Sequence, residues 1–418
     1  MREYLIVDDK KNNEYIQDNI KYQLRFCFPQ IKDVIFVDSG VKVIYEGNLV
    51  ESKVKEYMNK IEEKFSKLNF KVSKKKLYDS KTDAVKKFSN EDRKIFTGLG
   101  EELIEKLLSY DNTNDFVINS VVEVGEGLNV YTGQWILFHD LLEDLISKYL
   151  KLKFGAIELK VPSLISKEII EKSGYFETGS QHLSFIAPIS NDPDAYDELI
   201  KDKYCRFKGE IDFKESYKYF RSPNYVLNPA LCIHCYPIFK NKIFEKDKTI
   251  ALTIKGSCFR DESGNLNNKD RLNEFTMQEC VFFGNHENLI KIHQTLVDFI
   301  IYIGYLFGLD YTIETSNDIF FDENATQQLF SQIMSDNKIE FTVNCESISK
   351  SVAVASVNKH HSHFSDRFDM KDETGELINT MCLAFGFDRL ILVIQEAVSG
   401  DLKKLIDNIK LKCIKLLD

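Results

Sequence analysis

The 418-residue sequence lacks any run of roughly 18 consecutive apolar residues, the length that a membrane-spanning helix needs. Its first residues, MREYLIVDDKKNNEY, have no apolar core of signal-peptide length. Internal repeats and low-complexity tracts are absent as well. These absences predict a soluble, cytoplasmic protein without a membrane partner. With 43% apolar residues the chain can bury a sizeable core, and its length allows two or three domains.

Cysteine is sparse. Nine cysteines in 418 residues are too few for a dense disulfide framework, so we expect reduced thiols. A cysteine with a specific function would then be a metal ligand or a nucleophile.

The overall basic excess of a nucleic-acid-binding protein is also missing, because the net charge is −10 at pH 7. The charge is uneven, however. Between Lys53 and Lys94 there are 14 basic and 7 acidic residues. One interpretation is the solvated face of a lysine-rich helix, and the other is a docking surface for an acidic partner. The sequence leaves both open.

A change along the chain, from short alternating elements to longer apolar runs, predicts two domains. Residues 1–115 alternate short elements: a hairpin about Asp38-Ser39-Gly40, a helix over 53–68 and a possible returning strand over 69–78. We expect a lysine-rich α/β accessory domain there, ending in a linker at YDNTND, residues 110–115. Residues 116–418 carry more strands between helices than a doubly wound parallel sheet would, which predicts an α+β domain with a mainly antiparallel sheet.

Residues 256–284, GSCFRDESGNLNNKDRLNEFTMQECVFFG, read as two antiparallel strands joined by a polar turn. Because side chains alternate along a strand, Arg260 and Glu262 share a face of the first strand, and Arg271, Phe275 and Glu279 share a face of the second. The planar guanidinium group of arginine binds phosphate through two hydrogen bonds, and a phenylalanine ring stacks on a base. A carboxylate can accept a hydrogen bond from an adenine amino group. Exposed ion pairs on a hairpin are the plainer alternative.

A second segment has the same chemical character. Residues 378–396, INTMCLAFGFDRLILVIQE, predict an apolar strand, a corner at residues 384–387 and a helix with Arg389 in its first turn. Free N–H groups and the helix dipole favour phosphate at such a helix start, and the arginine adds positive charge. With the hairpin, this segment predicts a nucleotide site.

Together the two segments resemble motifs 2 and 3 of class II aminoacyl-tRNA synthetases, whose antiparallel sheet binds ATP. Helix 140–152 followed by GAIELKVPSL would be motif 1, with Pro162 near the contact of a homodimer. The Arg-x-x-x-Phe-x-x-x-Glu spacing resembles the seryl branch. Within that branch, the sequence is most similar to amino acid:[carrier protein] ligases, which are truncated seryl-type relatives.

Five ordered stretches carry this resemblance: NPALCIHCYPIF, CFRDES, RLNEFTMQECVFFG, ASVNKHHSHF and CLAFGFDRL. Together with GLNVYTGQWILFHDLL, near residues 127–142, they extend it over about 120–418. The resemblance implies that residues 116–418 form a class II synthetase-like catalytic domain. Residues 1–115 lie outside it.

The resemblance also implies a zinc ion held by two cysteines and one glutamate. Glu279 and Cys382 match directly, while the CIHC stretch offers either Cys232 or Cys235. We favour Cys232, because Pro-Ala-x-Cys is the family pattern and because on a strand His234 and Tyr236 would share its face. Three protein ligands leave a fourth zinc position for a substrate amino group. Taken singly, each cysteine could equally be a buried apolar residue.

The nucleotide roles follow from the same resemblance. Arg260 would hold the α-phosphate of ATP, Glu262 would accept from the adenine amino group, and Phe275 would stack on the ring. Arg271 and Arg389 would bind the γ-phosphate end, and Mg²⁺ would share the charge. Arg260 and Arg389 are the expected catalytic residues.

Several polar residues near the third and fourth stretches have two interpretations. The cluster His360, His361 and His363 could bind a metal, but we expect structural hydrogen bonds or contact with the substrate pocket. Glu340 is a candidate acidic neighbour of the site or a partner in a sheet ion pair. Ser356 and Asn358 are candidates for the nucleotide or magnesium side.

The implied function is activation of glycine, alanine or serine as an adenylate and transfer to the phosphopantetheine thiol of a carrier protein. A zinc-dependent seryl-tRNA synthetase is the alternative enzyme, and the basic segment of the N-terminal domain favours it. A non-catalytic paralogue that serves as a binding module is the third possibility, against which the retained arginines and Cys/Glu/Cys set count.

Overall fold

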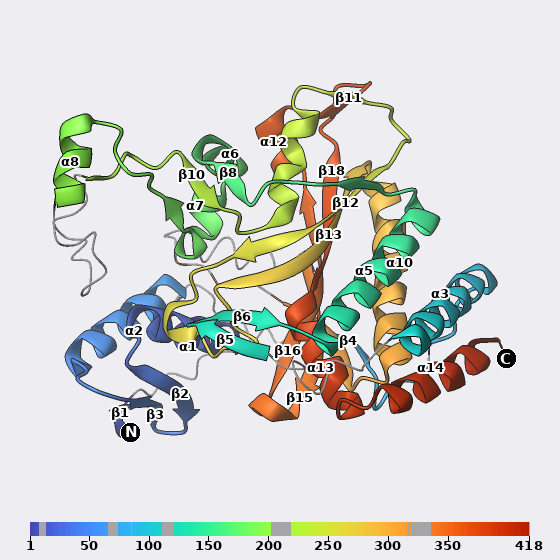
Figure 1. Ribbon diagram of the computed structural model, residues 1–418, viewed down its shortest axis with the longest axis horizontal. Helices are drawn as coiled ribbons and strands as arrows, with labels where there is room; N and C mark the ends of the chain where they lie inside the picture. Colours follow the sequence, from blue (N-terminus) through green and yellow to red (C-terminus); the bar gives the residue numbers. More distant parts are fainter. Residues whose placement is uncertain are drawn as a thin grey trace.

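The computed structural model describes residues 1–7, 14–65, 74–84, 86–110, 121–201, 219–316, 318–319, 321 and 336–417. These residues form an α+β structure in which a large antiparallel sheet is flanked by helices (Figure 1). A smaller N-terminal α/β unit lies beside it. The predicted fold class is therefore confirmed.

Eight strands of the described chain form the main sheet, in the order β4-β14-β15-β16-β18-β13-β12-β7. In chain order they are β4 (Lys76–Asp79), β7 (Ile157–Leu159), β12 (Ile250–Phe259), β13 (Glu274–Gly284), β14 (Tyr311–Thr315), β15 (Lys338–Cys345), β16 (Lys350–His361) and β18 (Asn379–Gly386). Neighbours are antiparallel, except that the edge strand β7 runs parallel to β12.

Long helices cover one face of this sheet and enclose the main hydrophobic core with it (Figure 1). They are α3 (Asn90–Ser109), α5 (Gln134–Phe154), α10 (His286–Phe307), α13 (Phe387–Val398) and α14 (Leu402–Leu417). Helix α10 begins at an Asn285 cap and ends at Gly308 in the left-handed region. Among the described helices it is the one long and apolar enough to cross a membrane, and over half of that window is buried inside the protein.

The other face of the sheet carries short elements and a second, smaller core. The elements packed there are the 3₁₀ turns η4 (Leu231–His234) and η5 (Tyr236–Phe239) and helix α12 (His363–Phe368). Leu231, Tyr236, Phe283 and Cys382 are buried in this core. The candidate metal ligands Cys232, Glu279 and Cys382 gather on this side.

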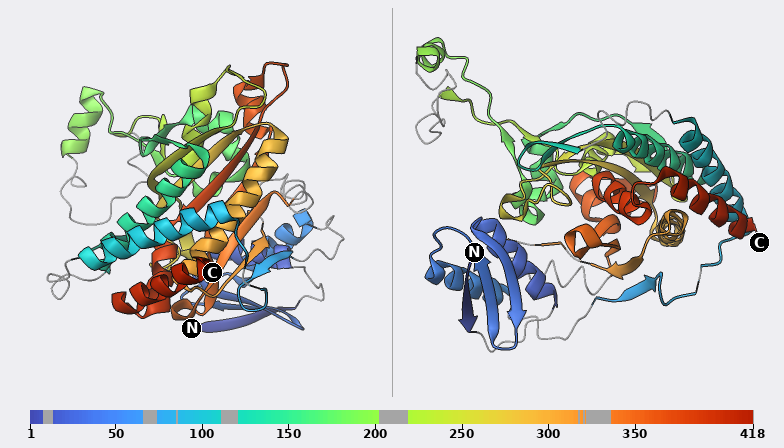
Figure 2. Two further views of the ribbon diagram at one scale, coloured as in Figure 1. Left: turned by 90° about the vertical axis from the view of Figure 1, so that its right-hand side faces the viewer. Right: turned by 60° about the horizontal axis from the view of Figure 1, so that its bottom comes forward.

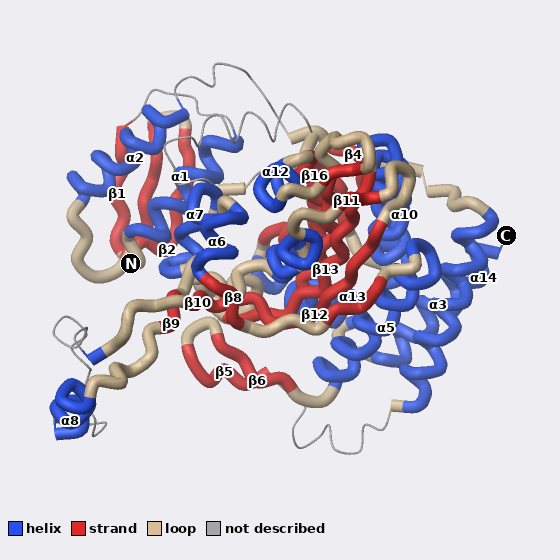
Figure 3. The backbone as a smooth tube through the Cα atoms, turned by 90° about the horizontal axis from the view of Figure 1, so that it is seen from above, coloured by secondary structure: helices blue, strands red, loops and turns tan. Residues whose placement is uncertain are grey.

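Smaller elements surround the second core. A three-stranded sheet is formed by β8 (Leu164–Ser166), β10 (Tyr225–Leu227) and β9 (Phe185–Ile186), next to α6 (Lys167–Ser173), α7 (Tyr175–Thr178) and η1 (Ser180–His182). Strands β5 (Val121–Gly125) and β6 (Leu128–Tyr131) form a hairpin, and β11 (Ile243–Phe244) pairs with β17 (Lys371–Asp372). The turns η6 (Ser263–Asn265) and η7 (Glu346–Ile348) complete the set. Helix α8 (Pro193–Lys201) projects away from the body of the protein (Figure 3).

The N-terminal unit has its own core. Its strands β1 (Arg2–Val7), β2 (Ile31–Val37) and β3 (Gly40–Tyr45) form an antiparallel sheet in the order β1-β3-β2, including the predicted hairpin. Helices α1 (Glu14–Cys27) and α2 (Glu51–Phe65) pack on it through buried residues such as Leu24, Val43 and Met58. Figure 2 shows this unit as a separate body beside the main sheet.

The predicted boundary at residue 115 is too late, because β4 and α3 pack with the main sheet. Strand β4 pairs with β14 at the sheet edge, and Phe96 of α3 lies in the main core beside Tyr302. The N-terminal core ends with Phe65. We therefore propose residues 1–65 as the accessory domain. The predicted linker lies, beyond Tyr110, outside the described residues, as do residues 69–73 of the possible strand at 69–78. The last three residues of that segment belong to β4.

A matched pair of glycine substitutions tests how α10 packs on the sheet. Gly304→Ala is expected to lower the free energy of unfolding by about 1–3 kcal/mol, because the added methyl group would overlap the buried ring of Tyr311. Gly98→Ala, in the interior of α3, is the control: its methyl group meets nothing within 4 Å and alanine favours a helix by up to about 1 kcal/mol. Urea unfolding measures both, and equal effects would contradict this packing.

Candidate active site

The predicted hairpin exists, but its polar side chains lie just beyond the paired strands. Strands β12 and β13 are antiparallel, with Cys258 opposite Phe275 and Ile254 opposite Glu279. Because β12 ends at Phe259 and β13 begins at Glu274, the residues Arg260, Glu262 and Arg271 belong to the connection. The prediction that these three residues lie on the two strands, with their faces set by strand alternation, was therefore wrong.

Arg260 is fixed at the mouth of the hairpin. Its backbone N–H donates to the carbonyl oxygen of Asn273 at 3.1 Å, which continues the strand pairing by one residue. Its Nε donates to the carbonyl oxygen of Pro229 at 3.1 Å, and its guanidinium carbon lies 5.4 Å from the centre of the Phe275 ring. A cation is thus held beside an aromatic face, which is an arrangement suited to a phosphate next to a base.

The buried Glu262 forms an ion pair with Arg271, whose side chain is partly exposed. The Arg271 Nη1 atom donates to both carboxylate oxygens, at 3.1 and 2.9 Å, and Glu262 is only 3% exposed. Burial raises the pKa of Glu262, but Arg271, His182 and Arg389 outweigh it, and the pKa lies below its ordinary value. The carboxylate is therefore ionised at neutral pH and can accept hydrogen bonds only.

Arg389 reaches the same place from the second predicted segment. Strand β18 ends at Gly386 and α13 begins at Phe387, so Arg389 stands in the first turn as predicted. Its Nε donates to the carbonyl oxygen of Asp270 at 2.7 Å and its Nη1 to that of Ala353 at 3.1 Å. Burial and then the positive charge of Arg271 lower the pKa of Arg389. Such crowding of guanidinium groups favours a polyanionic ligand.

The three predicted metal ligands come together on neighbouring elements. The ligand atoms of Cys232, Glu279 and Cys382 all lie within 4.8 Å of one another. Glu279 is oriented by two backbone donors, Leu231 N to Oε1 at 3.1 Å and Cys232 N to Oε2 at 2.9 Å. The Cys382 thiol donates to Glu279 Oε2 at 3.5 Å. Two sulfurs and a carboxylate form a donor set that fits zinc with three protein ligands.

Cys235 takes a different place from Cys232. It is fully buried in the second core and is not among the clustered ligands. One part of the reasoning for Cys232 was wrong: residues 231–234 form a 3₁₀ turn rather than a strand, so His234 and Tyr236 do not share a strand face with Cys232. The turn instead points successive N–H groups at Glu279. The eight cysteines in the described part of the chain form no disulfide.

The three histidines make structural hydrogen bonds. The Nδ1 atom of His360 lies 3.3 Å from the Tyr236 hydroxyl and 3.4 Å from the Thr380 hydroxyl. His361 Nε2 lies 2.6 Å from Asn337 Oδ1, and His363 Nε2 lies 3.0 Å from the carbonyl oxygen of Ser173. Burial and the neighbouring histidines lower the pKa of His360 to about 3, so it is neutral.

The remaining candidates also have local partners. Glu340 pairs with Lys338 at 3.0 Å and accepts from the Ser316 hydroxyl at 2.8 Å, which matches the sheet ion pair. Asn358 donates to Ser356 at 3.0 Å and lies opposite Cys382 in the sheet. Neither observation gives these residues a role in binding.

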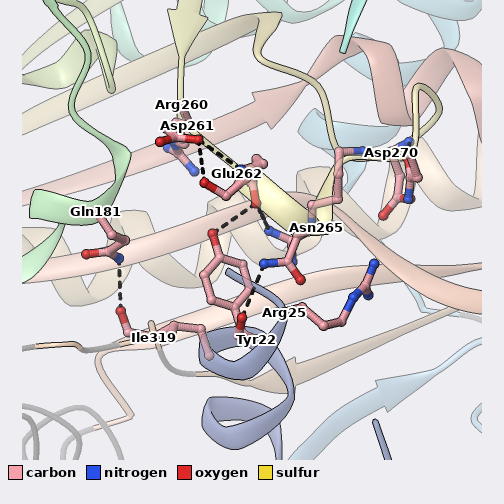
Figure 4. Close-up of polar contacts among 12 residues, drawn as sticks. Tyr22, Arg25, Gln181, Arg260, Asp261, Glu262, Asn265, Asp270 and Ile319 are labelled. Atoms are coloured by element: carbon pink, nitrogen blue, oxygen red, sulfur yellow. Dashed lines mark hydrogen bonds and ion pairs between the residues drawn. The ribbon is translucent and has the colours of Figure 1, made fainter. Parts of the chain in front are cut away.

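Two residues near the nucleotide side were missed by sequence reasoning. The hydroxyl of Tyr22, on α1 of the N-terminal unit, donates to Glu262 Oε2 at 2.9 Å (Figure 4). The ring of His182 packs edge-on against that of Tyr22, and burial with nearby Arg260 lowers its pKa to about 4. Both lie in segments without a motif, so no local signal in the sequence could have identified them.

The geometry agrees with comparisons to known proteins. Residues 217–398 match the family described as tRNA synthetase class II core domain (G, H, P, S and T). This range contains the hairpin, the three clustered ligands and Arg389. The chain contains a class II aminoacyl-tRNA synthetase core domain.

Two groups of curated relatives share this region. A type-2 serine–tRNA ligase of Methanocaldococcus jannaschii is 28% identical over 280 residues, 64% of this chain and 52% of that protein. An amino acid–[acyl-carrier-protein] ligase 2 of Bradyrhizobium diazoefficiens is 27% identical over 259 residues, 62% of this chain and 75% of that protein. The match to this chain thus spans about half the length of the serine–tRNA ligase.

A solved structure shares the fold. The seryl-tRNA synthetase of M. kandleri, in a crystal structure with A. aeolicus tRNASec, aligns over 98% of this chain and 77% of its own with a TM-score of 0.63. The sequence identity is 19%, so this similarity establishes the fold alone.

Proposed function

We propose that the protein activates a small amino acid, glycine, alanine or serine, as an aminoacyl-adenylate and transfers it to the phosphopantetheine thiol of a carrier protein. The observation that carries the proposal is that Glu279 and Cys382, which cluster with Cys232 of η4, stand on β13 and β18. These same strands adjoin the connection that holds Arg260 and Arg271 and the helix that holds Arg389. A metal able to take an amino group would then lie beside a site suited to ATP.

The nucleotide half of the proposal rests on the arginines and Phe275. Arg260 would bind the α-phosphate, because it is fixed beside the face of Phe275, where the adenine would stack. Arg271 and Arg389 would bind the γ-phosphate, which would draw the Arg271 guanidinium away from Glu262. Glu262 would then accept from the adenine amino group.

The chemistry needs positioning and charge stabilisation more than a base. The amino-acid carboxylate attacks the α-phosphorus of ATP, pyrophosphate leaves, and the developing negative charge is spread over phosphate oxygens. Arg260 would stabilise that charge at the reacting phosphate. Mg²⁺ bound with ATP supplies further positive charge. The carrier thiolate then attacks the adenylate carbonyl and AMP leaves.

The amino-acid half rests on the clustered ligands. Cys232, Glu279 and Cys382 would hold zinc, which when bound offers a fourth position to the substrate amino group. Glu279 would keep its orientation through the backbone donors at Leu231 and Cys232. The substrate would then be fixed by its amino group, with its carboxylate free to face ATP.

A homodimer is part of the proposal. Helix α5 and edge strand β7, to which the resemblance assigns motif 1, leave Leu152 66% exposed and Ile157 57% exposed. Apolar side chains at the edge of the described sheet fit a contact with a second copy.

The second candidate is a seryl-tRNA synthetase. The basic excess between Lys53 and Lys94 and the serine–tRNA ligase relatives favour it. The ASVNKHHSHF stretch, which forms the end of β16 and the start of α12, favours the carrier ligase through its resemblance to that family.

Transfer of radiolabelled amino acid from the adenylate separates these two functions. The holo-carrier is expected to become labelled, and the apo-carrier, which lacks the thiol, is the matched control. Total tRNA from the same organism is offered in parallel. Labelled tRNA together with an unlabelled holo-carrier would replace the carrier ligase by the synthetase.

A further inference from the structure

The N-terminal unit touches the proposed nucleotide site through one helix. Helix α1 packs on η6, the turn that directly follows Glu262, although the two lie some 240 residues apart (Figure 4). The Arg25 Nη2 atom donates to the carbonyl oxygen of Gly264 at 3.3 Å, and Asn265 Nδ2 donates to that of Tyr22 at 3.3 Å. A side chain at Gly264 would overlap the Arg25 backbone, so α1 and η6 pack too closely for any residue but glycine at this position.

The centre of this contact is the hydroxyl of Tyr22. It donates to Glu262 Oε2 at 2.9 Å, and the Arg271 guanidinium carbon lies 5.3 Å from the centre of the Tyr22 ring. Tyr22 is only 7% exposed, and its ring also contacts His182 and Phe321 edge-on. Glu262 is therefore held by one cationic partner from its own hairpin and one neutral partner from the other unit.

These two partners would respond differently to ATP. The γ-phosphate would compete with Glu262 for Arg271, since both are anions that bind a guanidinium fork. Tyr22 is neutral and donates a single hydrogen bond, so it offers the γ-phosphate far less than the Arg271 guanidinium does. A carboxylate has roughly four lone-pair positions, so Glu262 can accept from Tyr22 and from an adenine amino group at once.

We propose that Tyr22 is a positioning residue of the nucleotide site, which keeps the Glu262 carboxylate turned toward the adenine amino group once ATP has taken Arg271. This inference rests on the proposed function, because it requires Glu262 to accept a hydrogen bond from the adenine amino group. The N-terminal unit would then line part of the nucleotide site and contribute to the preference of that site for adenine.

Tyr22→Phe tests the proposal, because it removes the hydroxyl and keeps the ring. The KM for ATP in amino-acid-dependent pyrophosphate exchange is expected to rise about tenfold, the usual effect of losing a hydrogen bond to a charged group. The KM for inosine triphosphate, which carries a carbonyl oxygen in place of the amino group, is expected to stay within about twofold. Preference for ATP over inosine triphosphate therefore falls.

Tyr45→Phe is the matched control. Its hydroxyl also donates to a glutamate, Glu51 Oε1 at 3.3 Å, but within the N-terminal unit. Both KM values should remain those of the wild type. In a Glu262→Gln background, adding Tyr22→Phe should change the KM for ATP less than twofold, because the two residues act through one contact.

Other outcomes overturn the inference. A lower KM for ATP in Tyr22→Phe would mean that the phenol obstructs the nucleotide, and equal changes for both nucleotides, or none, would leave it a packing residue. Wild-type protein that shows no exchange with any amino acid, and no preference for ATP in calorimetric binding, would instead remove the proposed function and this inference with it.

Discussion

Replacing Arg260 with alanine is expected to lower amino-acid-dependent ATP–pyrophosphate exchange by roughly 100- to 1000-fold, the cost of removing one donor from a developing negative charge. Arg260 is held by the Pro229 carbonyl beside Phe275, and in the proposed function this placement would bring its guanidinium to the α-phosphate. The loss should fall mainly on kcat, because the charge that Arg260 would stabilise grows in the transition state.

Arg221→Ala is the matched control for Arg260. Its Nε also donates to a backbone carbonyl, that of Ile189 at 3.2 Å, but the residue is exposed and does not belong to the β12–β13 hairpin. Exchange by Arg221→Ala should equal that of the wild type. Wild-type exchange by a folded Arg260→Ala protein would remove Arg260 from the catalytic role.

Loss of a ligand from the proposed zinc site is the second large expected effect. Cys232→Ala is expected to reduce zinc content from about one ion per chain to nearly none, and exchange by more than about 100-fold, because two protein ligands cannot hold the ion and orient the substrate. Cys235→Ala should keep its zinc and most of its activity, since Cys235 lies in the second core and outside the ligand cluster. Metal analysis of the purified proteins measures the first effect directly.

Two outcomes of this metal analysis would contradict the proposed zinc ligands. Zinc retained in Cys232→Ala but lost in Cys235→Ala would assign the ligand to the other cysteine of the CIHC stretch. Zinc absent from the wild type after purification in zinc-supplemented medium, and not bound on titration, would exclude this metal from the site.

Local patterns in the sequence predicted what local forces determine. The β2–β3 hairpin follows from a turn between two apolar strands, and the position of Arg389 follows from an apolar strand ending in a glycine-containing corner. The resemblance brought together Cys232, Glu279 and Cys382, which are distant in the chain, because it carried the spacing of the whole family.

Contacts between distant segments could not be predicted in this way. Residues 76–109 have the texture of the N-terminal unit, yet their hydrogen bonds and apolar side chains find partners in the main sheet. The strand end at Phe259 depends on the connection that follows, so alternation misplaced Arg260 and Glu262. Tyr22 contacts Glu262 because the N-terminal unit packs against the main domain. The sequence around neither residue contains a pattern that predicts this contact.

The most direct measurement of the central claim is ATP–pyrophosphate exchange by zinc-replete wild-type protein with each of the twenty amino acids. We expect exchange with glycine, alanine or serine, and loss of that exchange in Cys382→Ala, because in the proposed function the amino acid would be held by a metal that Cys382 helps to bind. Exchange that survives in a folded Cys382→Ala protein would separate the metal from activation. Absence of exchange with every amino acid would contradict the adenylate-forming function itself.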